Sequence, residues 1–294
     1  MLLKWIGGKV QLGPWLHQRM PDHERYYEIF FGAGGFFWDK PLAKKGNVIN
    51  DLNSKIINLY RVVKNEETMK QLVQCFDNVI YSRELFDAFK TLYDDRTGNA
   101  WLDIGSKIPI DPRVKPSVQR AFVYIYLNRC SFNGQFQTFA HRSEGSPIYN
   151  LTDDIKRMFF KLNEGQVVIE QLSFEDMLEK VPDASDVFVY LDPPYWVTVL
   201  LQGKSYYEKV MTTEQHTTLR NMVCKFKQTK WMMSYDDVPE IRELYEGQPG
   251  VFINKTAVLN QSSSNANEKT TAKHELVISN YDINQIGGLF GGQN

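Results

Sequence analysis

The chain has 294 residues, of which 43% are hydrophobic and 23% charged, and its formal net charge at pH 7 is −1. This composition is typical of an ordinary globular protein with one large domain, or one domain that carries a sizeable insertion. A charge near zero excludes a generic, strongly basic nucleic-acid binder, so any such surface must be local. Isolated, odd-numbered cysteines favour a reduced, cytoplasmic setting, and no apolar run approaches the length of a membrane span.

The chain opens on Lys4-Trp5-Ile6-Gly7-Gly8-Lys9, ahead of a helix that we expect to end near Met20. Paired glycines let a backbone approach a ligand closely, Lys9 could reach a carboxylate, and Trp5 could cover an adenine or a sulfonium. The segment is not a P-loop, because Val10 follows Gly-Lys where Ser or Thr is required. A flexible N-terminal turn is the alternative interpretation.

A first strand is predicted over Tyr26–Phe30, followed by the glycine-rich Phe31–Gly35 and a helix from about Phe36. A strand, a glycine turn and a helix form the start of a nucleotide-type βα unit. The dinucleotide fingerprint requires a glycine where Phe37 stands, which argues against hydride transfer with a nicotinamide cofactor.

A second strand is predicted over Asn47–Asp51 and ends in an acid. Asp51 stands about twenty residues beyond the glycine turn, the spacing at which a carboxylate accepts hydrogen bonds from ribose hydroxyls. The same stretch could also begin the next helix, with Asn53 or Ser54 as its N-cap, and both interpretations can hold together. We therefore predict Asp51 as a ribose ligand.

The alternation of strands and helices stops between Ser54 and about Gly165. A long helical insertion between two strands of a sheet is most simply a second subdomain. Within it, Asn133-Gly134 is a strong turn signal, so the chain should reverse there. We predict helices over Ile56–Lys64, Glu67–Phe76, Arg83–Asp94, Ser117–Asn128 and Asp153–Leu162, and a hairpin over Thr138–Asn150.

The most informative stretch begins as an apolar run, Val187–Leu191, which is typical of a buried strand. Pro193 and Pro194 supply no N–H donors and cannot continue a sheet ladder, so Asp192 marks the carboxyl end of the strand. Open α/β sheets bind their ligands at that edge. A buried strand that ends in Asx-Pro turn chemistry, with Tyr195 in the core, is the structural alternative.

This set of groups suits an exocyclic amine that must attack an electrophile. The Asp192 carboxylate and the Pro193 carbonyl could each accept one N–H, which favours a pyramidal nitrogen and stabilises the positive charge that develops on it. Tyr195 offers a ring on which a flipped base can stack.

The remaining chain returns to alternating elements. We predict strands over Val167–Glu170, Lys230–Tyr235, Val251–Leu259 and His274–Tyr281, and a helix to about Lys227 that opens with the capping box at Thr212–Gln215. The polar segments Thr198–Val210 and Asn260–Lys273 suit loops.

Asp192-Pro193-Pro194-Tyr195 resembles the catalytic motif of amino-group DNA methyltransferases, and the chain as a whole resembles the Dam-type (α-group) DNA adenine-N6 methyltransferases. Four further segments carry the resemblance, which runs from about Leu3 to Tyr281: Lys4–Lys9, Glu28–Gly34, Leu127–Gly134 and Glu275–Tyr281. Ile29 stands where the family usually has proline.

The resemblance implies S-adenosylmethionine as cofactor and no metal. It places the reaction at Asp192, Pro193, Pro194 and Tyr195. The residues that would enclose the cofactor are Trp5, Gly7, Gly8, Lys9, Glu28, Phe30, Gly32, Gly34, Asp51, Leu52, Ser173, Phe174 and Asp192. Phe174 is also a candidate for the core.

The resemblance also implies double-stranded DNA as substrate, read by the inserted segment. The candidate nucleic-acid contacts are Lys115, Arg120, Asn128, Arg129, Asn133, Gln135, Gln137, His141 and Arg142. For each basic residue alone, a solvated surface charge is the simpler interpretation. The family often has an aromatic–arginine pair where this chain has Gln135-Phe136-Gln137, so its sequence specificity could differ.

We therefore expect an α/β fold: a seven-stranded, Rossmann-like S-adenosylmethionine-dependent methyltransferase sheet with an inserted helical target-recognition subdomain. The catalytic domain would comprise residues 1–55 and 166–284, the inserted domain residues 56–165, and a flexible tail residues 285–294. A restriction endonuclease counterpart is possible, and the oligomeric state and the recognition sequence stay open.

Three other functions remain open at this stage: two other methyl-transfer activities and one function without catalysis. N4-cytosine methyltransferases more often have Ser before the two prolines, and protein-glutamine methyltransferases more typically have Asn there. A catalytically silent DNA-binding module with the same fold is the alternative from another class, and the intact Asp192–Tyr195 motif argues against it.

Overall fold

The computed structural model describes residues 2–4, 9, 11–77, 79–94, 116–141, 147–196, 211–259 and 272–286. The chain forms two compact units. The helical unit comprises Met1–Gly8, Gly32–Gly34 and Asp51–Gln171, and the sheet unit comprises Lys9–Phe31, Gly35–Asn50 and Leu172–Asn294. The predicted domain boundaries and the recognition role of the insertion stay predictions.

Several predicted features lie outside the described residues. They are Trp5, Gly7, Gly8, Lys115 and Arg142, the loop Thr198–Val210, most of the loop Asn260–Lys273, and the tail from Gly287.

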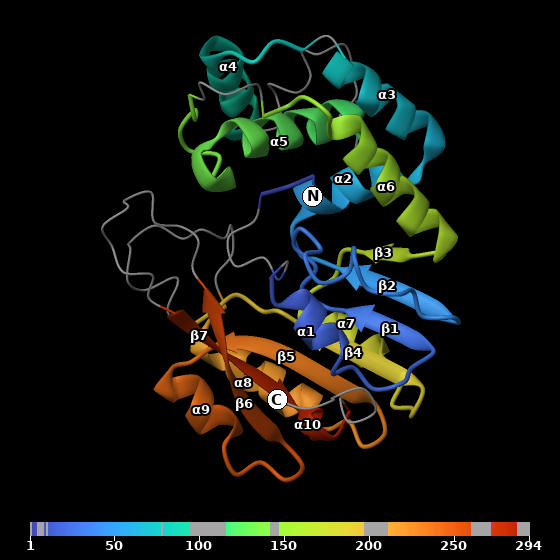
Figure 1. The fold of residues 1–294 in the computed structure, drawn as a ribbon, viewed down its shortest axis with the longest axis vertical. Coiled ribbons are helices and arrows are strands. Elements are labelled where there is room, and N and C mark those ends of the chain that lie inside the picture. Colours follow the sequence, from blue (N-terminus) through green and yellow to red (C-terminus); the bar gives the residue numbers. More distant parts are fainter. Residues whose placement is uncertain are drawn as a thin grey trace, which may run out of the picture. The chain divides into compact units, whose positions relative to one another are not determined.

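The strands form a seven-stranded sheet in the order β3-β2-β1-β4-β5-β7-β6 (Figure 1). The bounds are β1 Arg25–Glu28, β2 Gly46–Asn50, β3 Val168–Glu170, β4 Val187–Leu191, β5 Lys230–Asp236, β6 Phe252–Leu259 and β7 Ala272–Ser279. β1 pairs in parallel with β2 and β4, and β4 with β5, whereas β7 is antiparallel to β5 and β6. The predicted α/β fold with a seven-stranded sheet is confirmed.

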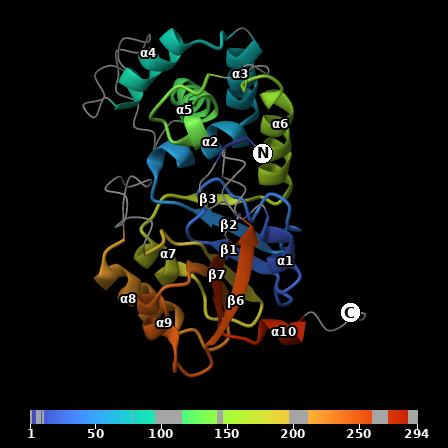
Figure 2. The ribbon, with the colours of Figure 1, turned by 60° about the vertical axis from the view of Figure 1, so that its left-hand side comes forward.

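All five residues of β4 are buried, because both faces of the strand are covered. On one face, Val189 and Leu191 join a core that includes α7 (Phe174–Lys180), α8 (Thr213–Val223) and α9 (Pro239–Tyr245) (Figures 1 and 2). On the other, Tyr190 stacks on Phe36 with ring centroids 3.8 Å apart. Complete burial of each large apolar side chain contributes roughly 1.5–3 kcal/mol, so β4 anchors the sheet unit.

The helix predicted from about Phe36 is wrong, because residues 35–39 form turns. Phe36 and Phe37 are 1% and 0% exposed, respectively. Phe37 and Tyr26 have ring centroids 6.0 Å apart. Consecutive side chains on a helix point about 100° apart, so two neighbouring aromatic rings are buried together more readily by a turn. Pro41 further disfavours helical backbone at Lys40.

The sheet unit also contains short helices at its two ends. α1 spans Gly13–His17, so the first predicted helix ends three residues before Met20, and α10 spans Ile283–Ile286. The capping box at Thr212 is confirmed, but α8 ends at Val223 rather than near Lys227. In the described part of the chain, no helix has the length and apolar character needed to cross a membrane.

The helical unit confirms the five helices predicted for the insertion. They are α2 Ser54–Lys64, α3 Glu66–Asp77, α4 Arg83–Asp94, α5 Val118–Cys130 and α6 Leu151–Glu164. Asn53 is the N-cap of α2, since its side chain accepts hydrogen bonds from the backbone N–H groups of Lys55 and Ile56. Eight of the thirteen residues of α5 are buried, which makes α5 the central helix of this unit.

After α5 the chain reverses, as the Asn133-Gly134 signal predicts, through the 3₁₀ turn Phe132–Gly134. Residues 142–146 of the predicted Thr138–Asn150 hairpin lie outside the described residues, and its described residues are assigned to no strand. They contain one isolated bridge, between Phe139 and Ser131, and a turn at residues 147–150. Through this bridge, Phe139 pairs with Ser131, the residue that follows α5, and not with a residue of the predicted hairpin.

The 3₁₀ turn rests on the N-terminal segment. The fully buried Asn128 side chain accepts from the backbone N–H of Lys4 at 2.8 Å and donates to its carbonyl at 2.9 Å. Gly134 has φ +72°, and a Cβ there would lie 2.7 Å from the Lys4 carbonyl oxygen. Only glycine fits this position without a shift of backbone atoms.

Gly134→Ala is expected to destabilise the protein by roughly 2–4 kcal/mol, because it adds a backbone clash to a left-handed conformation. Gly247→Ala is the matched control, since Gly247 has φ +75° and a Cβ there would meet no atom within 4 Å. The control should lose about 1 kcal/mol. Urea unfolding measures both variants, and equal losses would contradict the close packing of Gly134 on Lys4.

Candidate active site

Asp192 directly follows β4, the central strand of the seven-stranded sheet. β4 pairs with β1 in register Glu28↔Tyr190, and residues beyond these pairs leave the ladder at the same edge. The strand order reverses between β1 and β4, and such switch points are where open α/β sheets bind ligands. Pro193 and Pro194 end the strand, so the Asp192 carboxylate leaves the ladder at this edge.

Four side chains gather here, which we call the Asp192 cluster: Asp192, Lys9, Tyr195 and Glu275. The Lys9 ammonium lies 2.8 Å from Asp192 Oδ1 and donates a 2.7 Å hydrogen bond to the Tyr195 hydroxyl. Its Nζ is also 3.7 Å from Glu275 Oε2. The Lys9 side chain is 3% exposed and that of Asp192 is 23% exposed. Poorly hydrated charges are stable in proteins when each is paired with an opposite charge, as Lys9 and Asp192 are here.

The charge state of Asp192 is set by two opposing effects. Burial raises the pKa of Asp192 to about 6, because a poorly hydrated carboxyl group favours its neutral form. The Lys9 ammonium opposes this rise by its charge and hydrogen bond, whereas the Glu275 carboxylate adds to it. Asp192 is therefore mainly a carboxylate at neutral pH, and it becomes protonated as the pH falls through about 6.

The backbone after the prolines is held by β5. Asp236, 5% exposed, accepts a hydrogen bond from the Trp196 N–H at 3.2 Å. The Trp196 ring lies 4.9 Å from the His216 ring, and His216 in turn contacts the Tyr235 hydroxyl through Nδ1. Burial lowers the pKa of His216 to about 4, so this imidazole is neutral at physiological pH. Tyr195, 6% exposed, packs in the core of the sheet unit.

Four predicted cofactor residues lie in the sheet unit, two at the end of β1 and two at the start of α7. Glu28 is 2% exposed and accepts a 2.5 Å hydrogen bond from the Tyr26 hydroxyl. The half-buried Phe30 ring packs against Phe174, with centroids 5.7 Å apart. Ser173 is the N-cap of α7, accepting from the backbone N–H of Asp176. Phe30 and Phe174 therefore lie together, as predicted for one site, whereas the side chains of Glu28 and Ser173 are engaged in hydrogen bonds within the protein.

Asn50, which the sequence reasoning did not single out, links these segments. Its buried amide donates to the carbonyls of Ile29 and Leu172 and accepts from the Leu172 N–H at 2.9 Å. One side chain thus fixes the backbone after β1 to the backbone before Ser173. A polar residue at the end of an apolar strand was the available signal for it.

In the helical unit, Asp51 fixes the glycine turn. Its Oδ2 accepts from the Gly32 N–H at 2.7 Å and its Oδ1 from the Asn53 N–H at 2.8 Å. The Tyr60 hydroxyl donates to the Gly32 carbonyl at 2.6 Å. Gly32 and Gly34 have φ of +49° and +69°, the left-handed region that favours glycine. Next to Asp51, Leu52 is 46% exposed.

The predicted nucleic-acid contacts of the helical unit differ in accessibility. Asn133, Gln137 and His141 are exposed, and Gln135 and Arg120 are half-buried. Arg129 donates from Nε to the Pro147 carbonyl at 2.8 Å. Asn128 is fully buried and bonded to Lys4, so in this structure it supports the turn rather than facing outward. Phe132, which the prediction omitted, is 58% exposed beside Asn133.

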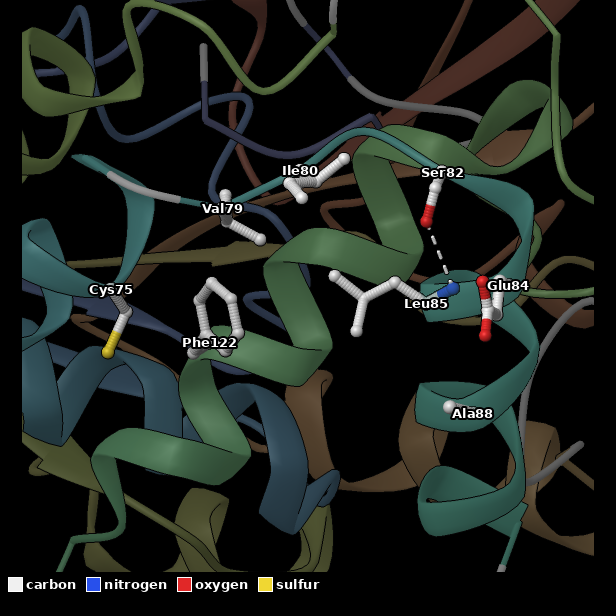
Figure 3. Close-up of a pocket in the computed structure, with 8 residues that line it drawn as sticks. All are labelled: Cys75, Val79, Ile80, Ser82, Glu84, Leu85, Ala88 and Phe122. Atoms are coloured by element: carbon white, nitrogen blue, oxygen red, sulfur yellow. Dashed lines mark hydrogen bonds between the residues drawn. The ribbon is translucent and has the colours of Figure 1, made fainter.

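A separate pocket of about 540 Å³ lies within the helical unit. Leu85 of α4 and Phe122 of α5 line it together with Cys75 of α3 (Figure 3). None of the predicted site residues borders it. Among the described residues, no group of three or more His, Cys, Asp or Glu side chains could hold a metal ion.

Comparison with known families shows which kind of protein the chain is. Residues 5–261 match the model of the D12 class N6 adenine-specific DNA methyltransferases. The chain belongs to this family. The resemblance read from the sequence is thus confirmed.

Individual relatives agree with this assignment. The chain is 29% identical to the Type II methyltransferase M1.LlaDCHI of Lactococcus lactis, covering 95% of this chain and 94% of the relative. It is 24% identical to the DNA adenine methylase of Escherichia coli K12, covering 74% and 73%. It is 23% identical to the Type II methyltransferase M.MjaIII of Methanocaldococcus jannaschii, covering 95% and 98%.

Family membership decides between the activities that the sequence left open. The chain is an adenine-specific DNA methyltransferase that acts on the N6 amine. The N4-cytosine, protein-glutamine and silent-module alternatives are thereby set aside. The roles of individual residues in the D12 site stay predictions.

The charge of Asp192 yields a pH prediction. Lys9→Met removes the ammonium that lowers the pKa of Asp192, so this pKa should rise above its present value of about 6. Because Asp192 is predicted to act as a carboxylate, the acidic limb of methyl transfer should move to higher pH, by on the order of one pH unit.

The measurement is the pH dependence of methyl transfer at saturating methyl donor. Lys255→Met is the matched control, since it removes the exposed ammonium that pairs with the half-buried Asp237 outside the Asp192 cluster. It should leave the acidic limb unchanged. An unshifted limb in Lys9→Met would contradict the pairing of Lys9 with a functional Asp192.

Proposed function

We propose that this chain transfers the methyl group of S-adenosylmethionine to the N6 amine of an adenine flipped out of double-stranded DNA. The observation that carries the proposal is the Asp192 carboxylate, which ends a fully buried strand and stays charged through its 2.8 Å contact with Lys9. A carboxylate next to a developing positive charge stabilises it most where water is scarce.

The described residues fit an adenosine-type cofactor. In the helical unit, Gly32 and Gly34 have left-handed backbone and no side chain, so a ligand can approach their backbone closely. Beside them, Asp51 has a half-buried carboxylate and Leu52 an exposed apolar side chain. In the sheet unit, the Phe30 and Phe174 rings form an apolar pair. A carboxylate can accept hydrogen bonds from ribose hydroxyls, apolar side chains can cover the face of a purine, and glycines let the ligand approach the backbone. When bound, the cofactor supplies an electrophilic methyl group.

At the reacting nitrogen, the chain would act through two acceptors. The Asp192 carboxylate and the Pro193 carbonyl would each accept one N–H of the adenine amine, which directs its lone pair away from both. After transfer the nitrogen must lose one proton. Asp192, whose pKa is about 6, is suited to take it and pass it to solvent.

Tyr195 would support the flipped base. The residue is 6% exposed, and its hydroxyl accepts a 2.7 Å hydrogen bond from Lys9. Stacking on a base therefore requires that the ring become uncovered on substrate binding. Extrusion of a base costs a few kcal/mol, which contacts in the site must offset.

For DNA recognition, we propose residues of α5 and of the segment that follows it. After α5, the exposed Asn133, Gln137 and His141 and the half-buried Gln135 carry amide and imidazole groups that can read base edges. Within α5, the half-buried Arg120 and Arg129 can contact phosphates. Gln137 stands where the family often has arginine, which supports a different target sequence. A restriction endonuclease counterpart is part of the proposal, because two relatives are named Type II methyltransferases.

Asp192→Ala should abolish methyl transfer, since it removes the acceptor of the amine and the carboxylate that stabilises the developing charge. Wild-type protein and variant are expressed in a methylation-free bacterial host, and the genomic DNA is sequenced by single-molecule kinetics. Wild type should leave N6-methyladenine at one short motif, and the variant none.

The control is Glu243→Ala, which changes an exposed residue on α9, and this variant should methylate DNA like the wild type. Calorimetry should find the affinity of Asp192→Ala for S-adenosylmethionine only partly reduced. Unchanged methylation by Asp192→Ala would refute the proposed mechanism, and N4-methylcytosine in place of N6-methyladenine would refute the base assignment.

Asp51→Ala should weaken cofactor binding first, raising the dissociation constant for S-adenosylmethionine roughly tenfold or more. Two losses combine: the predicted ribose contact and the hydrogen bond that holds the Gly32 N–H. Asp51→Asn keeps one acceptor oxygen and should lose less. Titration calorimetry measures both, with thermal unfolding to confirm folding, and wild-type affinity in Asp51→Ala would contradict the assignment.

A further inference from the structure

Glu275 is a buried acid that the proposed function does not use. It lies on β7 opposite Asp236 of β5, and its side chain is 7% exposed. Its Oε2 has no hydrogen-bond partner among the described residues. Buried carboxylate oxygens are nearly always bonded, so an unsatisfied one requires an explanation.

The cation beside this oxygen is already engaged elsewhere. Lys9 Nζ lies 3.7 Å from Glu275 Oε2, too far for a hydrogen bond but within ion-pair range. The same ammonium is 2.8 Å from Asp192 and 2.7 Å from the Tyr195 hydroxyl. A displacement of Lys9 Nζ by about 1 Å would convert the long contact with Glu275 into a hydrogen bond. The Lys9 ammonium thus lies between two carboxylates: it contacts the half-buried Asp192 and stands farther from the buried Glu275.

The position of Lys9 in this structure opposes the chemistry assigned to Asp192. The attacking amine gains positive charge, and an ammonium in contact with the same carboxylate repels that charge and weakens the carboxylate as an acceptor. Movement of Lys9 toward Glu275 would remove both effects while the ammonium stays paired. The unsatisfied oxygen of Glu275 is where such a displaced ammonium would be stabilised.

We propose that Glu275 is a positioning residue for methyl transfer: it receives the Lys9 ammonium when the target amine binds to Asp192. The inference rests on the proposed function, because it assumes that Asp192 accepts the adenine amine. Glu275 touches no reacting atom and acts through Lys9.

The groups that surround the Asp192 cluster allow this handover, by which we mean the movement of the Lys9 ammonium from Asp192 to Glu275. Lys9 and Tyr195 contact Asp192 directly, and Tyr190 of β4 also faces its charge. Burial holds the pKa of Tyr190 well above its usual value, so this phenol stays neutral. Opposite Glu275 in the sheet lie Asp236 of β5 and Thr256 of β6, and neither is a cation. Among these groups, Lys9 is therefore the cation available to Glu275.

Glu275→Gln tests the proposal, because it keeps the shape of the side chain but removes the charge that would receive Lys9. We expect kcat to fall roughly tenfold, with the KM for duplex DNA and the dissociation constant for S-adenosylmethionine within about twofold of wild type. The DNA is a duplex that carries the motif methylated by wild type.

A second readout separates positioning from a merely structural role. Glu275 raises the pKa of Asp192, so its loss should move the acidic limb of the pH profile to lower pH, by on the order of half a unit. Lys9→Met is expected to move the same limb in the opposite direction. Damage to folding would lower the plateau without moving the limb. Glu243→Gln, an exposed change, is the control and should alter neither.

The handover also predicts coupling between the two residues. In a Lys9→Met background there is no ammonium to receive, so Glu275→Gln should cause no further loss of kcat. Wild-type kcat in Glu275→Gln, or an equal loss in both backgrounds, would overturn the proposal. If Glu275→Gln does not fold, Glu275→Asp replaces it: the withdrawn carboxylate should lower kcat at least roughly threefold, and an unchanged kcat would overturn the proposal.

Asp192→Ala, measured alongside, separates two kinds of failure. Retained methyl transfer in Asp192→Ala refutes the proposed function itself. Loss of transfer in Asp192→Ala together with wild-type behaviour of Glu275→Gln refutes only the role of Glu275.

Discussion

The site depends on keeping a charge where water is scarce. Asp192 ends a strand whose five residues are all buried, and this position raises its pKa to about 6. Without a cation nearby, the carboxyl group would be neutral over more of the physiological range. Lys9 prevents that, but the same contact competes with any other group that needs the carboxylate. The nearby Glu275 gives the ammonium a second place to go, so charge can be retained without blocking Asp192.

A second pattern is that carboxylates and amides hold backbone at the places where strands end. Asp51 binds the N–H groups of Gly32 and Asn53, Asn50 bonds Ile29 and Leu172, and Asp236 holds the Trp196 N–H. Loops that carry ligand-binding groups need such bonds because they lack a ladder of their own. A few polar side chains, rather than regular structure, therefore hold the backbone of these segments in place.

The sequence predicted most of the frame of the molecule, because apolar runs and capping signals are local. The β4 strand, the Asn53 and Thr212 caps and the reversal at Asn133-Gly134 can each be recognised within a few residues. The helix at Phe36 was predicted wrongly, since the burial of Phe36 depends on stacking against Tyr190 of β4, which is remote in sequence.

The site was predictable in part for the same reason. Asp192 and Lys9 lie in recognisable motifs, but their 2.8 Å contact joins the N-terminus to β4. Glu275 stands in a strand pattern that looks ordinary in sequence, and only the fold brings it to Lys9. The burial of Asn128 was likewise invisible, because its partner Lys4 is 124 residues away along the chain.

The attachment of Asn128 and Gly134 to Lys4 has an evolutionary consequence. A helical insertion that is predicted to read DNA invites the view that relatives could exchange it as a unit and so acquire new target sequences. Here the turn that bears Asn133 takes its shape from backbone atoms at the start of the chain. A transplanted insertion would therefore arrive without one of its own supports unless the first residues were inherited with it. The turn and the first residues of the chain therefore form one structural unit, although 124 residues separate Lys4 from Asn128.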